Sequence, residues 1–241
     1  MKRFLYYLPI ACLIISCANP APAPWSLRDV PAGTVLSDST ICNNPFDSLF
    51  VQSAIDSALF ERIRGKSYKD YCTVPLSELR YLKVLHKNLE GETLVGEMIC
   101  SWKISDDLTE IFKELYRLDY PIEKMVLVDE YDADDDLSME ANNSSCFNYR
   151  TIANTTKISY HGLGLAVDIN PKYNPYVKKV GDVVKVWPVS SYIYVEDRDK
   201  RDDIPYLIKK GDPCYQAFIS RGFEWGGEWT SSKDYQHFEK H

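Results

Sequence analysis

The alternation of apolar and polar residues along the chain predicts both helices and strands. Residues 81–85 and 94–102 are apolar runs of strand length, rich in Leu, Val and Ile. Residues 105–118 carry apolar side chains at helical spacing, with Ser105 as a candidate N-cap and two aspartates in the first turn. Residues 46–63 have a similar but more irregular apolar stripe, and we expect a helix there too.

The second half of the chain predicts shorter elements. We expect strands at 125–128, 164–169 and 235–239, and a helix from Asp212 and Pro213 to about residue 221. Gly181 and Asp182, flanked by valines, indicate a hairpin turn. The mixture predicts an α+β fold, a small antiparallel sheet flanked by helices.

Residues 129–145 form a long polar segment, which we interpret as a solvated loop. Four of its acids favour a calcium site as the alternative: Asp132, Asp134, Asp135 and Asp136. The EF-hand pattern is not met, because no glycine follows at its turn position.

The composition indicates one globular, acidic domain. The chain has 241 residues, of which 45% are hydrophobic and 26% charged, and its net charge is -7. This length suits one domain with a substantial core, which we place at residues 41–241 and expect to be monomeric. Since no basic cluster is present, a nucleic-acid partner is not expected.

The N-terminus reads as an export signal. Lys2 and Arg3 precede an apolar run over 4–15, which is too short to span a bilayer as a helix. The run ends at Ser16-Cys17, which resembles the lipobox of bacterial lipoproteins. We therefore predict a signal peptide over 1–17, lipidation of Cys17, and a flexible proline-rich tether over 18–40.

This interpretation places the folded part outside the cytoplasm, facing the periplasm or the cell exterior. The membrane would be contacted only through the N-terminal lipid. An ordinary signal peptide, or an uncleaved anchor, is the alternative and gives the same side of the membrane. Five cysteines remain beyond the signal, so at least one thiol stays unpaired, and their pairing cannot be deduced: Cys42, Cys72, Cys100, Cys146 and Cys214.

Two segments carry candidate metal chemistry. In the first, His161 is followed by Gly162 and Gly164, which allow a sharp turn, and then by an apolar strand whose one acid is Asp168. A carboxylate in such a strand is costly unless it is paired or bound to a cation. Imidazole and carboxylate are ordinary zinc ligands, but a core histidine with an ion-paired aspartate fits this segment equally well.

The second segment combines Trp225-Gly226-Gly227-Glu228-Trp229 with Asp234 and His237. Asp234 and His237 are three residues apart, so on a regular strand they face opposite sides. Both can reach one site only if the chain turns or bulges between them. Glu239 shares the face of His237 and is a rival acid. The tryptophans taken alone fit an ordinary core.

Together the two segments resemble the zinc peptidase family of D-alanyl-D-alanine carboxypeptidases and L-alanyl-D-glutamate endopeptidases. The shared pattern is Ser-x-His-x-x-Gly-x-Ala-x-Asp, here from Ser159 to Asp168, followed at a distance by Asp-x-x-His, here Asp234 and His237. The aspartate in the second motif resembles the endolysin-like branch. Residues 143–150 resemble the segment that supplies the active-site arginine of the family, here Arg150.

The resemblance implies a role for each matching residue. His161, Asp168 and His237 would bind zinc at the sheet. Asp234 would be the general base, with Glu239 as the alternative. Arg150 would stabilise the oxyanion or hold a substrate carboxylate, and Ser159 and Trp225 would contact the substrate.

The resemblance further implies that the substrate is the peptide part of peptidoglycan. D-alanyl-D-alanine carboxypeptidase activity is the leading expectation, and L-alanyl-D-glutamate endopeptidase activity is the alternative. Two other classes stay open. One is a wall-binding lipoprotein that keeps the metal but has lost turnover, and the other is a structural lipoprotein without metal.

Overall fold

The computed structural model describes residues 25–153, 155–204 and 206–241. Cys17 and the predicted signal peptide lie outside these residues. The α-helices are α1 (Asp38–Cys42), α2 (Ser57–Ile63), α3 (Trp102–Arg117), α4 (Asp135–Glu140) and α5 (Pro213–Ile219). The strands are β1 (Val51–Ser53), β2 (Leu79–Lys87), β3 (Thr93–Ser101), β4 (Ala166–Asp168), β5 (Tyr176–Val180), β6 (Val183–Trp187), β7 (Glu224–Trp225), β8 (Lys233–Asp234) and β9 (His237–Glu239).

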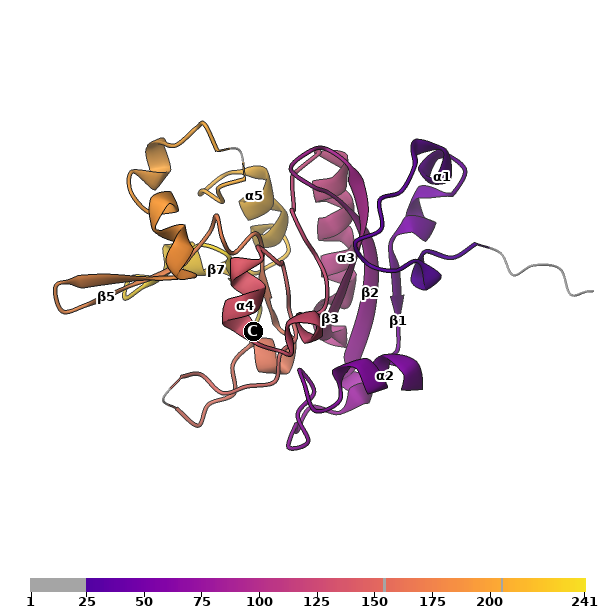
Figure 1. Ribbon diagram of the computed structural model, residues 1–241, viewed down its shortest axis with the longest axis horizontal. Coiled ribbons are helices and arrows are strands. Elements are labelled where there is room, and N and C mark those ends of the chain that lie inside the picture. The colour runs from indigo at the N-terminus through magenta and orange to yellow at the C-terminus, as the bar shows by residue number, and fades with distance from the viewer. Residues whose placement is uncertain (1–24, 154, 205) are drawn as a thin grey trace, which may run out of the picture.

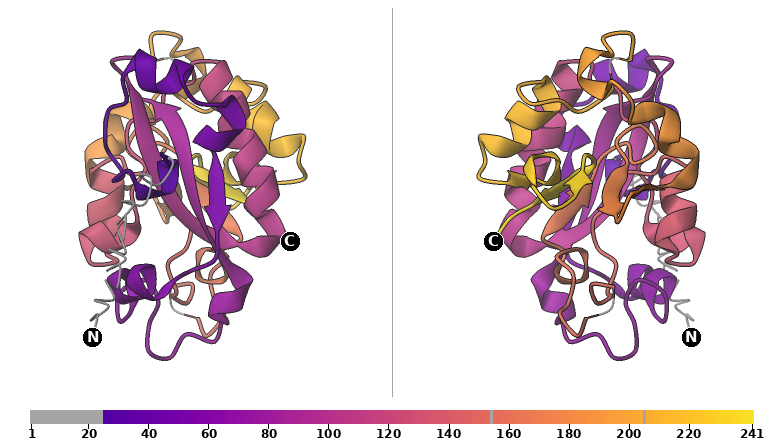
Figure 2. Two further views of the ribbon diagram at one scale, coloured as in Figure 1. Left: turned by 90° about the vertical axis from the view of Figure 1, so that its right-hand side faces the viewer. Right: turned by 90° about the vertical axis from the view of Figure 1, so that its left-hand side faces the viewer.

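The strands form three small antiparallel sheets, ordered β1-β2-β3, β4-β9-β7 and β6-β5-β8. The first sheet packs against α3, and α3 also contacts α5 (Figure 1). The hairpin of β5 and β6 projects from the body of the molecule in Figure 1, and the right-hand view of Figure 2 faces the side from which it projects. This architecture confirms the predicted α+β class with small antiparallel sheets.

One hydrophobic cluster joins the first sheet to the C-terminal elements. Its buried members include Leu85 of β2, Phe112 of α3, Phe218 of α5 and Phe238 of β9. The rings of Phe218 and Phe238 stack with centroids 4.1 Å apart. Helix α3 packs against both the first sheet and α5. The short C-terminal strands are therefore held against a larger core.

The folded part begins earlier than residue 41. Leu27 is fully buried. Gly33 and Leu36 donate backbone hydrogen bonds to Val95 and Thr93 of β3, at 2.8 and 2.9 Å. The segment predicted as a tether over 18–40 is therefore packed on the domain from about residue 27.

The segment 129–145 is not the solvated loop that we predicted. It contains a 3-10 helix, Val128–Tyr131, and α4, whose N-cap is Asp134. Asp129 is buried and accepts hydrogen bonds from the backbone N–H and hydroxyl of Ser67, both at 2.9 Å. In this segment Asp134 therefore caps α4, and Asp129 anchors the neighbouring chain at Ser67.

No helix within the described residues has the length and apolarity that a membrane crossing requires. In the same residues all five cysteines are free thiols, with Cys100, Cys146 and Cys214 buried.

Candidate metal centre and its cavity

The chain enters the site through a tight turn that carries His161. The Ser159 hydroxyl accepts a hydrogen bond from the His161 backbone N–H at 3.3 Å, and a 3-10 turn, His161–Leu163, follows. The buried His161 ring donates from Nδ1 to the carbonyl oxygen of Cys146 at 2.7 Å. A carbonyl can only accept, so this bond fixes the tautomer and leaves a lone pair on Nε2.

Glycines at this turn are required by close backbone approaches. Gly164 has a φ of 66°, and a Cβ built on it would lie 2.7 Å from the backbone nitrogen of Ser101. A Cβ on Gly162 would lie 2.9 Å from the carbonyl oxygen of Arg150. The glycines of the first motif therefore hold the histidine turn against the end of β3 and against the segment of Arg150.

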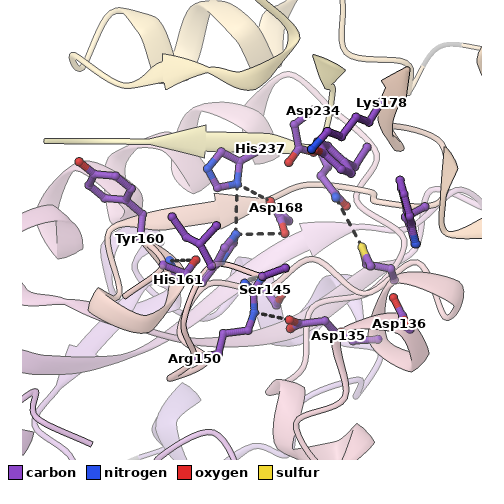
Figure 3. Close-up of a pocket in the computed structure, with 18 of the residues that line it drawn as sticks. Asp135, Asp136, Ser145, Arg150, Tyr160, His161, Asp168, Lys178, Asp234 and His237 are labelled. Carbon is purple, nitrogen blue, oxygen red and sulfur yellow. Dashed lines mark hydrogen bonds and ion pairs between the residues drawn. The ribbon is translucent and has the colours of Figure 1, made fainter. Parts of the chain in front are cut away.

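Asp168 and His237 meet because they are direct cross-strand partners of β4 and β9. An Asp168 carboxylate oxygen lies 3.1 Å from Nδ1 of His237, and the other lies 3.2 Å from Nε2 of His161. The two imidazole nitrogens are themselves 3.1 Å apart. Potential ligand atoms of the three residues all lie within 4.8 Å of one another (Figure 3).

Glu239 holds the other side of the His237 ring. Its carboxylate lies 3.1 Å from Nε2 of His237, so Nε2 donates to Glu239, and Nδ1 faces Asp168 and can offer a lone pair to a cation once its proton is lost. A carboxylate behind a ligating histidine is a common arrangement at metal sites, because it orients the ring and raises its basicity.

The donor set fits zinc. Two imidazole lone pairs and a carboxylate converge with little space between them, which is unfavourable unless a cation or a proton separates them. Although burial disfavours the charged imidazole, hydrogen bonds to Asp168 and Glu239 raise the pKa of His237 to about 10. Burial opposes ionisation of Asp168 as well, but the two histidines hold the pKa of this carboxyl well below its usual range. The site thus favours positive charge at its centre.

Asp234 reaches the same cavity through a change of sheet. It belongs to β8, which pairs with β5, whereas His237 belongs to β9, which pairs with β4 and β7. The chain bends at residues 235–236 between the two strands. The two residues are three apart and would face opposite sides of a regular strand. The bend between them lets both side chains reach one cavity.

Asp234 is half-buried, and its buried Oδ1 has no hydrogen-bond partner among the described residues. Burial raises the pKa of Asp234 to about 6, against the opposing charge of His237. A Cβ on Gly226 would lie 2.8 Å from the Asp234 Cβ, so this glycine lets the two segments touch.

Arg150 and Asp135 form an ion pair at the opposite side of the site from Asp234 (Figure 3). Asp135 is held in turn by Nδ2 of Asn148 at 2.8 Å. The Arg150 side chain is 38% exposed, so a ligand in the cavity can reach it. The sequence did not place Asp135 at this site, because it could not be distinguished from the other acids of the polar segment 129–145.

The structure separates the two tryptophans of the second motif. Trp225 is buried, donates from its indole N–H to the Tyr235 carbonyl at 2.8 Å and packs on Phe238. Trp229 lines the cavity, with its ring centroid 5.3 Å from that of His237. Trp229, rather than Trp225, is thus positioned to contact a ligand.

These residues surround a cavity of about 780 Å³. Its walls include all three candidate ligands together with Asp234, Arg150, Ser159, Glu239, Asp135, Asp136, Trp229, Tyr176, Lys178, Lys185 and Trp187. The hairpin residues of β5 and β6 gave no signal in the sequence beyond β propensity, since their place at the cavity depends on the pairing of β5 with β8.

Comparison with known proteins agrees with this geometry. No curated protein and no solved structure matches the chain. Residues 153–240 match a family described as D-alanyl-D-alanine carboxypeptidase. The matched segment covers less than half of the chain and contains His161, Asp168, Asp234 and His237.

Proposed function

We propose that the chain is a zinc peptidase that hydrolyses peptidoglycan stem peptides, with D-alanyl-D-alanine carboxypeptidase activity as the leading assignment. The observation that carries the proposal is the convergence of the free nitrogens of His161 and His237 on the carboxylate of Asp168. Their other ring nitrogens are bonded to the Cys146 carbonyl and to Glu239. Such a preset arrangement suits a catalytic metal site with three protein ligands.

His161, Asp168 and His237 would hold the zinc ion. When bound, zinc would lower the pKa of a coordinated water molecule and polarise the scissile carbonyl.

Asp234 is our candidate for the proton carrier. Its carboxyl group lines the cavity and can accept a proton from the attacking water, whose oxygen bonds to the scissile carbonyl carbon. When the C–N bond breaks, the same carboxyl can give that proton to the leaving amine. Glu239 fits this role less well, because it faces the far nitrogen of His237.

Arg150 and Ser159 have supporting roles in this proposal. Arg150 lines the cavity with a guanidinium that can stabilise the oxyanion or bind a substrate carboxylate. Ser159 accepts from the backbone N–H of His161, so we assign it to orienting that ligand.

L-alanyl-D-glutamate endopeptidase activity is the second candidate, since the same site can cut within the stem. Mass spectrometry of digested muropeptides distinguishes the two, because one releases a single alanine and the other splits the stem. A wall-binding protein without turnover would bind purified cell wall but release no amine from it.

The decisive variant is Asp234→Asn. We expect it to lower the rate of stem-peptide cleavage by about 10²- to 10⁴-fold, the usual contribution of a general base. Zinc content, measured by elemental analysis, should stay at that of the parent chain because Asp234 is not in the ligand set. Cleavage at the parental rate would remove Asp234 from the mechanism.

We further propose that the protein is exported and anchored by lipid on Cys17, as the sequence over 1–17 predicts. Metabolic labelling with a fatty-acid analogue, lost in Cys17→Ser, tests this anchor.

A further inference from the structure

The sheet formed by β6, β5 and β8 presents one face to the cavity. In its register Asp234 pairs with Tyr176, and Tyr176 pairs with Trp187. Directly paired residues project to the same face of a sheet. The three side chains therefore form one row, and all three line the cavity.

The next row on this face consists of two lysines. Lys178 lies two residues beyond Tyr176 on β5, and its cross-strand partner on β6 is Lys185. Alternation along a strand puts both lysines on the face of Asp234, and both line the cavity. Figure 3 shows Lys178 on the same side of the cavity as Asp234.

This lysine pair has no counter-charge among the residues that the structure describes. Like charges directly opposite each other destabilise a sheet. The chain carries a net charge of -7, yet neither Lys178 nor Lys185 has a described carboxylate within ion-pair distance. Asp135, which lines the same cavity, is paired with Arg150 instead. Two exposed ammonium groups thus face the cavity unpaired.

We propose that Lys178 and Lys185 form an anion subsite that binds a carboxylate of the substrate. Successive rows on one face of a strand are about 7 Å apart, which is the span of about two residues of an extended peptide. The preferred substrate is therefore an acidic peptide whose free carboxylate lies about two residues from the bond that Asp234 faces. The link to that bond rests on the proposed function, whereas the binding preference does not.

The stem peptide fits this class, since its glutamyl residue keeps a free α-carboxylate. The aromatic row of Tyr176 and Trp187, with ring centroids 5.6 Å apart, would support the apolar part of the peptide between the carboxylate and the scissile bond.

β5 offers a matched control. Lys179 is exposed and adjacent in sequence, but it projects to the opposite face and does not line the cavity. Lys179→Gln removes the same charge from the same hairpin and separates a local contact from a change in net charge.

The experiment measures peptide binding by calorimetry in the full chain carrying Asp234→Asn, with one equivalent of zinc added, so that cleavage does not interfere. The probes are two synthetic stem peptides, identical except that the glutamyl α-carboxylate is free in one and amidated in the other. We expect the free carboxylate to bind about fivefold more tightly, the size expected from two partly exposed ion pairs. Lys178→Gln with Lys185→Gln should abolish this preference, Lys179→Gln should keep it, and Lys178→Arg with Lys185→Arg should restore it.

Equal affinity for the two peptides, no binding of either, or a preference that survives in the double glutamine variant would overturn the subsite. Failure of the proposed function looks different. A chain that retains Asp234, prefers the free carboxylate and yet cleaves neither peptide would keep the anion subsite and remove the peptidase activity.

Discussion

At the scale of single residues, the second nitrogen of each imidazole determines what the first can do. His161 donates to the Cys146 carbonyl, and His237 donates to Glu239. The Cys146 carbonyl and the Glu239 carboxylate thus hold the far nitrogens of the two rings, and the near nitrogens both face Asp168. The sequence predicted three candidate ligands and Asp234 as the base, but it left Glu239 as an alternative base, because alternation alone did not show its place behind His237.

Glu239→Gln tests the supporting role of this carboxylate. The amide is a poorer acceptor for the His237 N–H, so we expect zinc affinity to fall by about 10- to 100-fold, the usual effect of removing such a partner. Competition with a fluorescent chelator measures it. Glu224→Gln is the control, since Glu224 pairs with Glu239 across β7 and β9 but is exposed. If Glu239 were the general base, the variant would instead keep its zinc and lose turnover.

His86 is a buried histidine that lies outside the site. Its Nδ1 donates to the Ile122 carbonyl at 2.7 Å, and burial lowers its pKa to about 4. The unfolded chain binds a proton near pH 6.5, whereas the folded chain does not until about pH 4. The contribution of neutral His86 is therefore complete above pH 6.5 and is lost as the pH falls toward 4.

We expect this histidine to remove about 3 kcal/mol of stability between pH 7 and pH 4. Urea unfolding of the parent chain and of His86→Leu, at several pH values, measures the contribution. The variant should be less stable at pH 7, because the Ile122 carbonyl loses its donor, and its stability should depend less steeply on pH. Identical slopes for the two proteins would show that His86 does not titrate in this range.

At the scale of elements, tight turns matter more than the strands that they connect. β4 and β9 have three residues each, and their register alone brings Asp168 opposite His237. The turn at Gly164 sets where β4 begins. It combines a positive φ with a close approach to Ser101.

Gly164→Ala and Gly181→Ala separate these two requirements. Gly181 has a similar φ of 61°, but a Cβ there meets nothing within 4 Å. We expect Gly181→Ala to cost about 1 kcal/mol, the conformational penalty alone. Gly164→Ala should cost about 3 kcal/mol, because the methyl group also overlaps the backbone of Ser101. Thermal unfolding of both variants measures the difference, and equal losses would contradict a steric role for the contact.

The sequence predicted helices and strands well where the hydrophobic periodicity was strong. It predicted them less well where a side chain, rather than a second strand, bonds the backbone. The strands at 81–85 and 94–102, the hairpin at Gly181 and the helix after Asp212 are all present. The longest helix begins earlier than predicted, with Ser101 as N-cap, and Ser105 instead donates to the Trp102 carbonyl within it.

Two predicted elements were wrong for identifiable reasons. Residues 46–63 do not form one helix, because Val51–Ser53 pairs with β2 as an edge strand. Residues 125–128 form no strand, because the Asn143 side chain bonds both the N–H and the carbonyl of Val126, at 2.9 and 3.0 Å. The Asn143 amide thus takes the place of a neighbouring strand, and the apolar pattern of residues 125–128 does not predict this.

At the scale of the whole molecule, the site depends on contacts between distant parts of the chain. The two motifs were found from the sequence because each is local, but their meeting is produced by a core that joins α3, α5 and β9. The lysine face of β5 and β6 was not found, because its position at the cavity follows from the pairing of β5 with a strand more than fifty residues later.

Bound zinc should therefore stabilise the fold by linking the two segments that carry the candidate ligands. The three candidate ligands span residues 161–237, and the unfolded chain cannot keep them together. Ligand that binds only the folded state at a thousandfold excess over its Kd stabilises that state by about 4 kcal/mol. For a chain of this size we expect zinc to raise the Tm by about 10 °C, and a chelator to reverse the rise.

Asp168→Asn should lose most of this shift, because it removes the charge between the histidines, whereas Asp234→Asn should keep it. Differential scanning fluorimetry with and without zinc compares the two aspartates directly. Since both are half-buried and line the same cavity, a difference between them reports ligation rather than general damage to the fold. A zinc-independent Tm in the parent chain would mean that the three side chains stabilise one another through a shared proton, and the metal assignment would fail together with the peptidase proposal.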